Sequence, residues 1–330
     1  MTDAGRHPGP VPPRSTRSCR ARRDFPMKRN PRSRLLLRWP RLGLLAGVFA
    51  IAIGARAADA GADATPLAAA RQLFDGGRFP EARAAFERLV AAEPRNAEAL
   101  FYLGWTAFRQ NQPAESAKLL EKATALDGTK SVYFRVLGDA CVEMIQRASF
   151  FAKAGWARRS LTAYDKAVAL DPDDLDARSA RLNYYWHAPG IAGGSMDKAR
   201  AEAREIAKRD PVRGAQALAD LNVAEKKYAE AFAVIDELIT QHPDNQPAQY
   251  QLGRLAAITG QQLERGETAL QAYLQYSPVG REPAPCAAHW RLGMIHERKG
   301  DAAAARTEYE AALNLAPDFA VARDALQKLR

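Results

Sequence analysis

Three residues toward the end of the chain, Cys286, His289 and His296, are of the types that bind zinc. His289 and His296 are seven positions apart, which on a helix is two turns, or about 10 Å. One zinc ion cannot join side chains so far apart, because its bonds to nitrogen are only about 2 Å long. Cys286 and His289 alone would leave the coordination shell incomplete. We therefore expect no metal here.

Two other segments have the composition of ion-binding loops without their spacing. The glycine-rich segment 188–194 lacks the GxGxxG pattern and the Gly-Lys-Ser/Thr ending of phosphate-binding loops. The aspartates at 171, 173, 174 and 176 lack the central glycine and the closing glutamate of a calcium loop. We expect a long turn in the first segment. In the second we expect helix capping, which aspartate favours at helix N-termini.

No serine, histidine, cysteine or carboxylate residues can be assembled into a catalytic triad or an acid–base pair with any specificity. The chain is therefore expected to have no enzymatic activity and no cofactor. Its long Ala-, Glu-, Lys-, Leu- and Arg-rich segments favour helix, because these side chains lose little rotamer freedom there. The function should come from a helical surface.

The net charge of +10 over 330 residues would favour nucleic-acid binding if it were spread over the fold. Residues 1–57, however, hold 13 of the 48 basic residues and only 2 of the 38 acidic ones. The remainder has 35 basic and 36 acidic residues. It has no excess of positive charge to attract phosphates, so we expect no nucleic-acid partner.

The basic N-terminal region has the order of a secretory signal peptide. Six Lys or Arg residues lie between Met27 and the uncharged run Leu42–Ala55, and Ala55-Arg56-Ala57 has the small-x-small pattern of a cleavage site. We expect a disordered or untranslated segment over 1–26, a signal peptide over 27–57 and a periplasmic or secreted mature chain. The alternative is an inner-membrane anchor with the leader uncleaved; the start at Met1 or Met27 and the Sec or twin-arginine route stay open.

The rest of the chain, 58–330, is periodic. A residue that stops a helix recurs at spacings of 34, 44, 39, 32, 35 and 39, and these stops are Pro94, Gly128, Pro172, Pro211, Pro243, Pro278 and Pro317. Two amphipathic helices fit into each period. The pattern predicts about seven helix pairs over residues 63–317, and Phe319–Leu329 has the spacing of a final capping helix.

Within the pairs, a Leu-Gly step in the first helix is followed by alanine and a bulky residue in the second. The matches are Leu103-Gly104 with Leu120 and Ala123, Leu137-Gly138 with Tyr164 and Ala167, Leu252-Gly253 with Leu270, and Leu292-Gly293 with Ala305, Tyr309 and Ala312. This pattern resembles the tetratricopeptide repeat, and the leader makes the chain similar to exported bacterial members. The pairs ending at Pro211 and Pro243 lack Leu-Gly. Insertions lie between Gly138 and Tyr164 and around 188–194.

The resemblance implies an all-α, right-handed solenoid whose first helices line a concave, peptide-binding face. Carried over by register, that face consists of Phe101, Trp105, Phe108, Arg135, Asn183, Trp186, Asn222, Tyr250, Arg254 and Trp290. Aromatic rings can anchor an extended peptide, and amides can bind its backbone. These side chains could equally be packing against neighbouring helices. We predict a non-enzymatic scaffold for a protein or peptide partner, alternatively a membrane-anchored assembly factor; membrane contact is expected only through an uncleaved leader.

Overall fold

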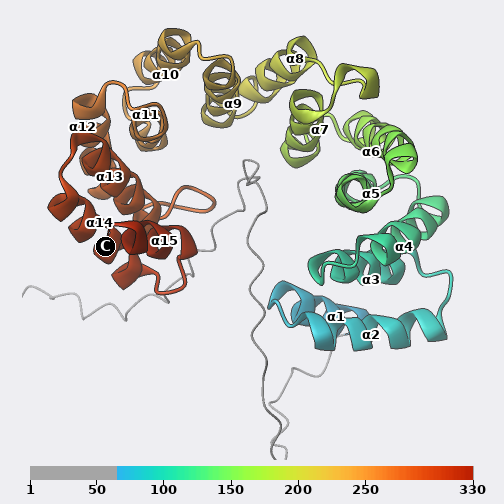
Figure 1. The fold of residues 1–330 in the computed structure, drawn as a ribbon. Helices are drawn as coiled ribbons and strands as arrows, with labels where there is room; N and C mark the ends of the chain where they lie inside the picture. The colour runs from blue at the N-terminus through green and yellow to red at the C-terminus, as the bar shows by residue number, and fades with distance from the viewer. Residues whose placement is uncertain (1–64, 330) are drawn as a thin grey trace, which may run out of the picture. The chain divides into compact units, whose positions relative to one another are not determined.

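The computed structural model describes residues 65–329, and these form fifteen α-helices and one 3₁₀ turn, with no strand among them (Figure 1). They divide into two compact units, and the chain passes from the first to the second between residues 221 and 222. The expected all-α repeat fold is confirmed. The expected disordered segment 1–26 and signal peptide 27–57 lie outside the described residues. No helix within 65–329 has the length and apolarity needed to cross a membrane.

The first unit contains four antiparallel helix pairs. Each helix packs on its neighbour in the chain, and α5 also contacts α7. The helices are α1 (Pro66–Asp75), α2 (Phe79–Ala92), α3 (Ala97–Arg109), α4 (Pro113–Leu126), α5 (Ser131–Arg147), α6 (Phe150–Leu170), α7 (Leu175–His187) and α8 (Met196–Ala207), with a 3₁₀ turn at Gly190–Ala192. Helix α9 (Pro211–Ala224) crosses the boundary between the units.

The second unit contains two complete helix pairs, α11–α12 and α13–α14, with α10 before them and α15 after them. Its helices are α10 (Tyr228–Gln241), α11 (Gln246–Thr259), α12 (Leu263–Leu274), α13 (Pro285–Lys299), α14 (Ala302–Leu315) and α15 (Ala320–Lys328). Helices α11 and α13 lie against each other, and α15 packs on α14. The helix stops expected from the sequence hold at most positions. The stop at Pro211 holds as well, because α8 ends at Ala207; this proline also opens α9, where its missing N–H costs nothing.

Glycine brings the two helices of a pair into contact at the predicted Leu-Gly steps. A Cβ added to Gly138 would lie 2.4 Å from Tyr164 Cε1, and one added to Gly253 would lie 2.2 Å from Leu270 Cγ. The same close approach occurs at Gly104 against Leu120 and at Gly293 against Tyr309. We call such a place, where a helical glycine faces a bulky side chain of the second helix, a glycine seat.

Helix starts follow ordinary capping chemistry. Asn96 accepts a hydrogen bond from the Ala99 N–H at 2.9 Å at the start of α3. At the start of α7, Asp174 accepts from the backbone N–H groups of Asp176 and Ala177, both at 2.9 Å. The capping role expected for this aspartate cluster is therefore confirmed for Asp174.

Candidate partner-binding face

In the first unit, aromatic side chains from α1, α2 and α3 form one cluster. The Trp105 ring lies 4.8 Å from Phe74 and 5.3 Å from Phe101, measured between centroids. Phe86 stacks on Tyr102 at 5.3 Å. Trp105 stays half-buried, whereas Phe101 is only 2% exposed. Trp105 therefore presents part of its ring at the surface of a rigid apolar base.

Charged groups of α5 extend this aromatic cluster. The Arg135 guanidinium lies 5.8 Å from the Trp105 ring centroid, a cation–π distance. Arg135 also donates a hydrogen bond to Asp139 at 3.0 Å, and Asp139 accepts another from the Tyr164 hydroxyl at 2.9 Å. The pKa of the Asp139 carboxyl is raised overall, because the effect of burial is larger than the opposing effect of the neighbouring Arg135. We call Trp105, Phe108, Arg135 and Asp139 the mixed strip.

Helix α7 carries two more of the predicted residues. Asn183 is exposed, and Trp186 is half-buried against the apolar cluster of α7, α8 and α9. The Trp186 ring stacks on His187 at 4.6 Å. Because α5 and α7 are in contact, Asn183 and Trp186 lie on the helix next to the one that carries Arg135.

The four predicted residues of the second unit have unequal exposure. Asn222 and Tyr250 are each only 6% exposed, and Tyr250 packs on Tyr273 at 5.2 Å. Arg254 is half-buried and donates to Gln251 at 2.8 Å. Trp290 is half-buried between Phe319, 5.9 Å away, and the Arg291 guanidinium at 3.9 Å. Arg254 and Trp290 are thus the accessible members in this unit.

Three of the ten predicted residues therefore belong to the core instead of an open surface. Phe101 stacks on Tyr133 at 4.2 Å, and Asn222 and Tyr250 are likewise closed off by neighbouring helices. Helical spacing assigns all three to the same helix stripe as the half-buried residues. Only part of this stripe is exposed, because the next helix of the stack covers one edge of it.

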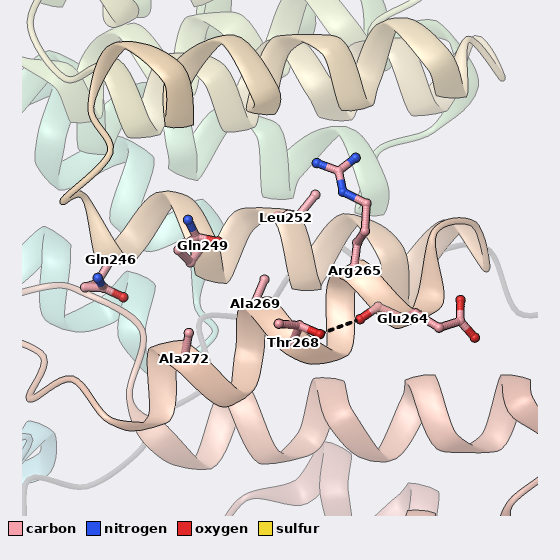
Figure 2. Close-up of a pocket in the computed structure, with 8 residues that line it drawn as sticks. All are labelled: Gln246, Gln249, Leu252, Glu264, Arg265, Thr268, Ala269 and Ala272. Carbon is pink, nitrogen blue, oxygen red and sulfur yellow. Dashed lines mark hydrogen bonds between the residues drawn. The ribbon is translucent and has the colours of Figure 1, made fainter.

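The second unit has a shallow hollow of about 480 Å³ on a different face of α11 (Figure 2). It is lined by Gln246, Gln249, Leu252, Glu264, Arg265, Thr268, Ala269 and Ala272. Arg265 also pairs with Asp236 of α10 at 2.7 Å. The sequence did not predict this hollow, because its lining combines ordinary polar helix residues with Leu252 and Ala269, which also belong to the core. It contains neither Tyr250 nor Arg254.

The residues that could have formed ion sites are used for packing and turns. His289 Nδ1 lies 2.7 Å from Glu308, while Cys286 is buried in another cluster. Within residues 65–329, no group of three metal-binding side chains converges. In the glycine-rich segment, the Tyr184 hydroxyl donates to the Ala192 carbonyl at 2.6 Å. This bond holds the segment as a turn between α7 and α8.

Comparison with known proteins gives the same fold. Tetratricopeptide repeat models match residues 67–130 and 286–319. A tetratricopeptide repeat protein from Parabacteroides merdae is 16% identical, with a TM-score of 0.55 over 80% of this chain and 97% of that one. Yeast Tom70 is 15% identical, with a TM-score of 0.58 over 76% of this chain and 51% of that one.

Comparison with curated protein sequences gives no significant match, and the identities above show the fold alone. Two segments match the models of this repeat, and glycine seats recur in both units. Stacked helix pairs of this kind provide extended surfaces for other polypeptides. The chain therefore contains tetratricopeptide repeats, in a fold that serves as a scaffold for protein–protein interaction.

Proposed function

We propose that the chain is a non-enzymatic scaffold that binds an extended polypeptide on the mixed strip and the neighbouring surface of α7. The observation that carries this proposal is the contact of Arg135 with both Trp105 and Asp139. It joins an aromatic anchor to a charged pair on adjacent first helices. A bound peptide could place an apolar side chain on Trp105 and Phe108, while the amide of Asn183 bonds its backbone.

The chemistry of the strip sets the type of peptide. Arg135 and Asp139 already neutralise each other at 3.0 Å, so a highly charged peptide would have to break this pair to gain a new one. The strip also carries no lysine clamp for a C-terminal carboxylate. An internal segment with one or more apolar side chains is therefore the partner that fits it best.

Site-specific photo-crosslinking tests the location. A photoreactive amino acid at Asn183, which is exposed, should crosslink a discrete partner in cells. The matched control is Lys166, an exposed residue of α6. Equal crosslinking at both positions, or none at Asn183 while a partner still co-purifies, would place the binding surface elsewhere.

A second measurement tests the anchor. Trp105→Ala should weaken capture of the crosslinked partner at least as much as Arg135→Ala does, because the ring supplies most of the apolar contact. Circular dichroism must show that each variant is still helical. Undiminished capture by a folded Trp105→Ala variant would contradict the proposal.

The cellular location is a proposal from the leader alone. We infer a cleaved signal peptide over 27–57 and a periplasmic or secreted mature chain. N-terminal sequencing of the mature protein should find a first residue near Ala58. Retention of Leu42–Ala55 would favour the membrane-anchored alternative.

A further inference from the structure

The α5–α6 hairpin is longer than the other hairpins of its unit. Helices α5 and α6 have 17 and 21 residues, whereas α3 and α4 have 13 and 14. Seven additional residues lengthen a helix by about 10 Å. The first turns of α6 therefore extend beyond the part of the helix that packs on α5 near Gly138 and Tyr164.

Two adjacent phenylalanines lie at this tip and contact almost nothing else. Phe150 is 83% exposed and Phe151 is 91% exposed. Their rings touch only edge to face, at 5.6 Å between centroids. Ala152, Ala154 and Gly155 beside them are exposed as well. Such exposure of two large apolar side chains is unfavourable in water and marks a contact surface.

The charge around the tip is positive. Lys153 and Arg158 are exposed, and neither makes an ion pair with another described residue. Arg158 lies seven positions after Phe151, on the same face of α6. Arg147, at the end of α5, is exposed as well and donates to the Asn111 carbonyl at 3.2 Å. Over residues 142–162, Glu143 is the only acidic residue.

The shape and area of the tip favour a membrane surface over a protein partner. Each phenylalanine offers roughly 150–250 Å² of apolar surface, and the small residues beside them add little. That is less than the roughly 800 Å² per partner of a typical stable protein interface. Aromatic side chains inserted between lipid headgroups, with basic residues binding anionic headgroups, need no larger area.

We propose that the tip of the α5–α6 hairpin docks the protein on an anionic lipid surface. Phe150 and Phe151 insert at the interface, and Lys153 and Arg158 bind the headgroups. This contact is independent of the mixed strip and of the uncharged run in the leader. It is peripheral and reversible, since two aromatic side chains and a few basic ones do not span a bilayer.

A local fluorescent probe tests this contact in the full chain, even if the leader itself binds lipid. Ala152→Cys, in a Cys19→Ser background, places an environment-sensitive dye between the phenylalanines and Lys153. Burial raises the pKa of the Cys141 thiol to about 12, and Cys286 is 1% exposed, so the added thiol reacts selectively. The matched control is Ala303→Cys, an exposed position at the equivalent tip of α14.

The dye at position 152 should shift to shorter wavelength and gain several-fold in intensity with vesicles of phosphatidylcholine and phosphatidylglycerol. It should respond weakly to phosphatidylcholine alone, and the dye at 303 should respond to neither. Adding Phe150→Ser and Phe151→Ser should abolish the shift, and Lys153→Glu with Arg158→Glu should remove the preference for the anionic vesicles.

Three results would overturn the proposal. One is an absent shift at position 152. Another is an equal shift at 152 and 303, which would mean adsorption through some other part of the chain. The third is a shift that depends on protein concentration without vesicles, which would assign the tip to a second copy of the chain.

Discussion

The neighbouring hairpins α5–α6 and α7–α8 place large and small side chains on opposite helices. Gly138 is the eighth residue after the N-cap Lys130, and the large Tyr164 of α6 faces it. In α7 the eighth residue after the N-cap Asp174 is Leu182. Leu182 packs in one cluster with the small Ala203 of α8. The combined side-chain volume of the two facing positions is similar in both hairpins, because α7–α8 carries the large residue on its first helix and α5–α6 carries it on its second.

The two hairpins also differ in their polar contacts. The Tyr164 hydroxyl donates to Asp139 in α5–α6. In α7–α8, Glu202 accepts from Arg181 at 2.5 Å and from Arg178 at 3.3 Å, and the side chains of Arg178 and Glu202 are below 10% exposed. The stability of α5–α6 therefore depends mainly on the fit of Tyr164 against Gly138. The stability of α7–α8 depends on side-chain fit together with a buried ion network.

Breaking the ion network should have the largest effect. Glu202→Ala leaves two arginines without their buried partner and should destabilise α7–α8 by about 3–5 kcal/mol. Glu205→Ala on the same helix is the control: Glu205 pairs with Lys208 and Arg209 near the surface, where a pair contributes about 0–1 kcal/mol. Hydrogen exchange of the α7 and α8 amides measures both. Equal protection in the two variants would contradict this ranking.

The reversed size pair can be tested by a double-mutant cycle. Leu182→Ala should cost about 2–5 kcal/mol, because it leaves a cavity beside Ala203. Adding Ala203→Leu should recover part of the loss, which corresponds to a coupling of about 0.5–3 kcal/mol. Urea unfolding of the four proteins measures the cycle. Additive single effects would show that the two positions do not compensate each other.

The glycine seat should be intolerant of a single methyl group. Gly138→Ala puts a Cβ 2.4 Å from the buried Tyr164 ring and should cost about 1–3 kcal/mol. Gly155→Ala in α6 meets nothing within 4 Å and should instead stabilise the helix by about 0.5–1 kcal/mol. Thermal unfolding compares them. The seat interpretation fails if the two changes shift the midpoint in the same direction.

The smallest effect should come from the tyrosine hydroxyl. Tyr164→Phe removes the bond to Asp139 and should cost about 0.5–1.5 kcal/mol near neutral pH. Burial and the Asp139 carboxylate raise the pKa of Tyr164 well above its usual range. The buried, protonated form therefore contributes stability below about pH 10 that is lost as the pH rises further. Above that pH the wild type should lose stability faster than Tyr164→Phe; parallel curves would contradict the assignment.

The difference between these hairpins explains how far the sequence could predict the fold. The resemblance of the Leu-Gly step and its bulky partner to the tetratricopeptide pattern predicted the seat at Gly138. The same search found only a degenerate repeat at α7–α8. A pattern that specifies which helix carries the large residue cannot detect Leu182 and Ala203, although both belong to one buried cluster.

The site residues could be predicted only to the level of a helix stripe. Spacing put Phe101 and Trp105 on one face of α3, but burial by Tyr133 of the following pair separates them. The sequence likewise revealed an insertion before Tyr164 without showing its form. That form depends on both helices being extended, so that Phe150 and Phe151 come to lie beyond their neighbours.

The length of that insertion has a geometric consequence. Tyr164 follows the N-cap of α6 by 15 residues, whereas Leu120 follows the N-cap of α4 by 8. The difference of seven is close to two helical turns at about 3.6 residues each. The added segment therefore returns Tyr164 to the same azimuth toward Gly138. The length of this hairpin can therefore change independently of its packing. Removing or adding two whole turns of α6 would change how far the tip extends, while Tyr164 would still face Gly138.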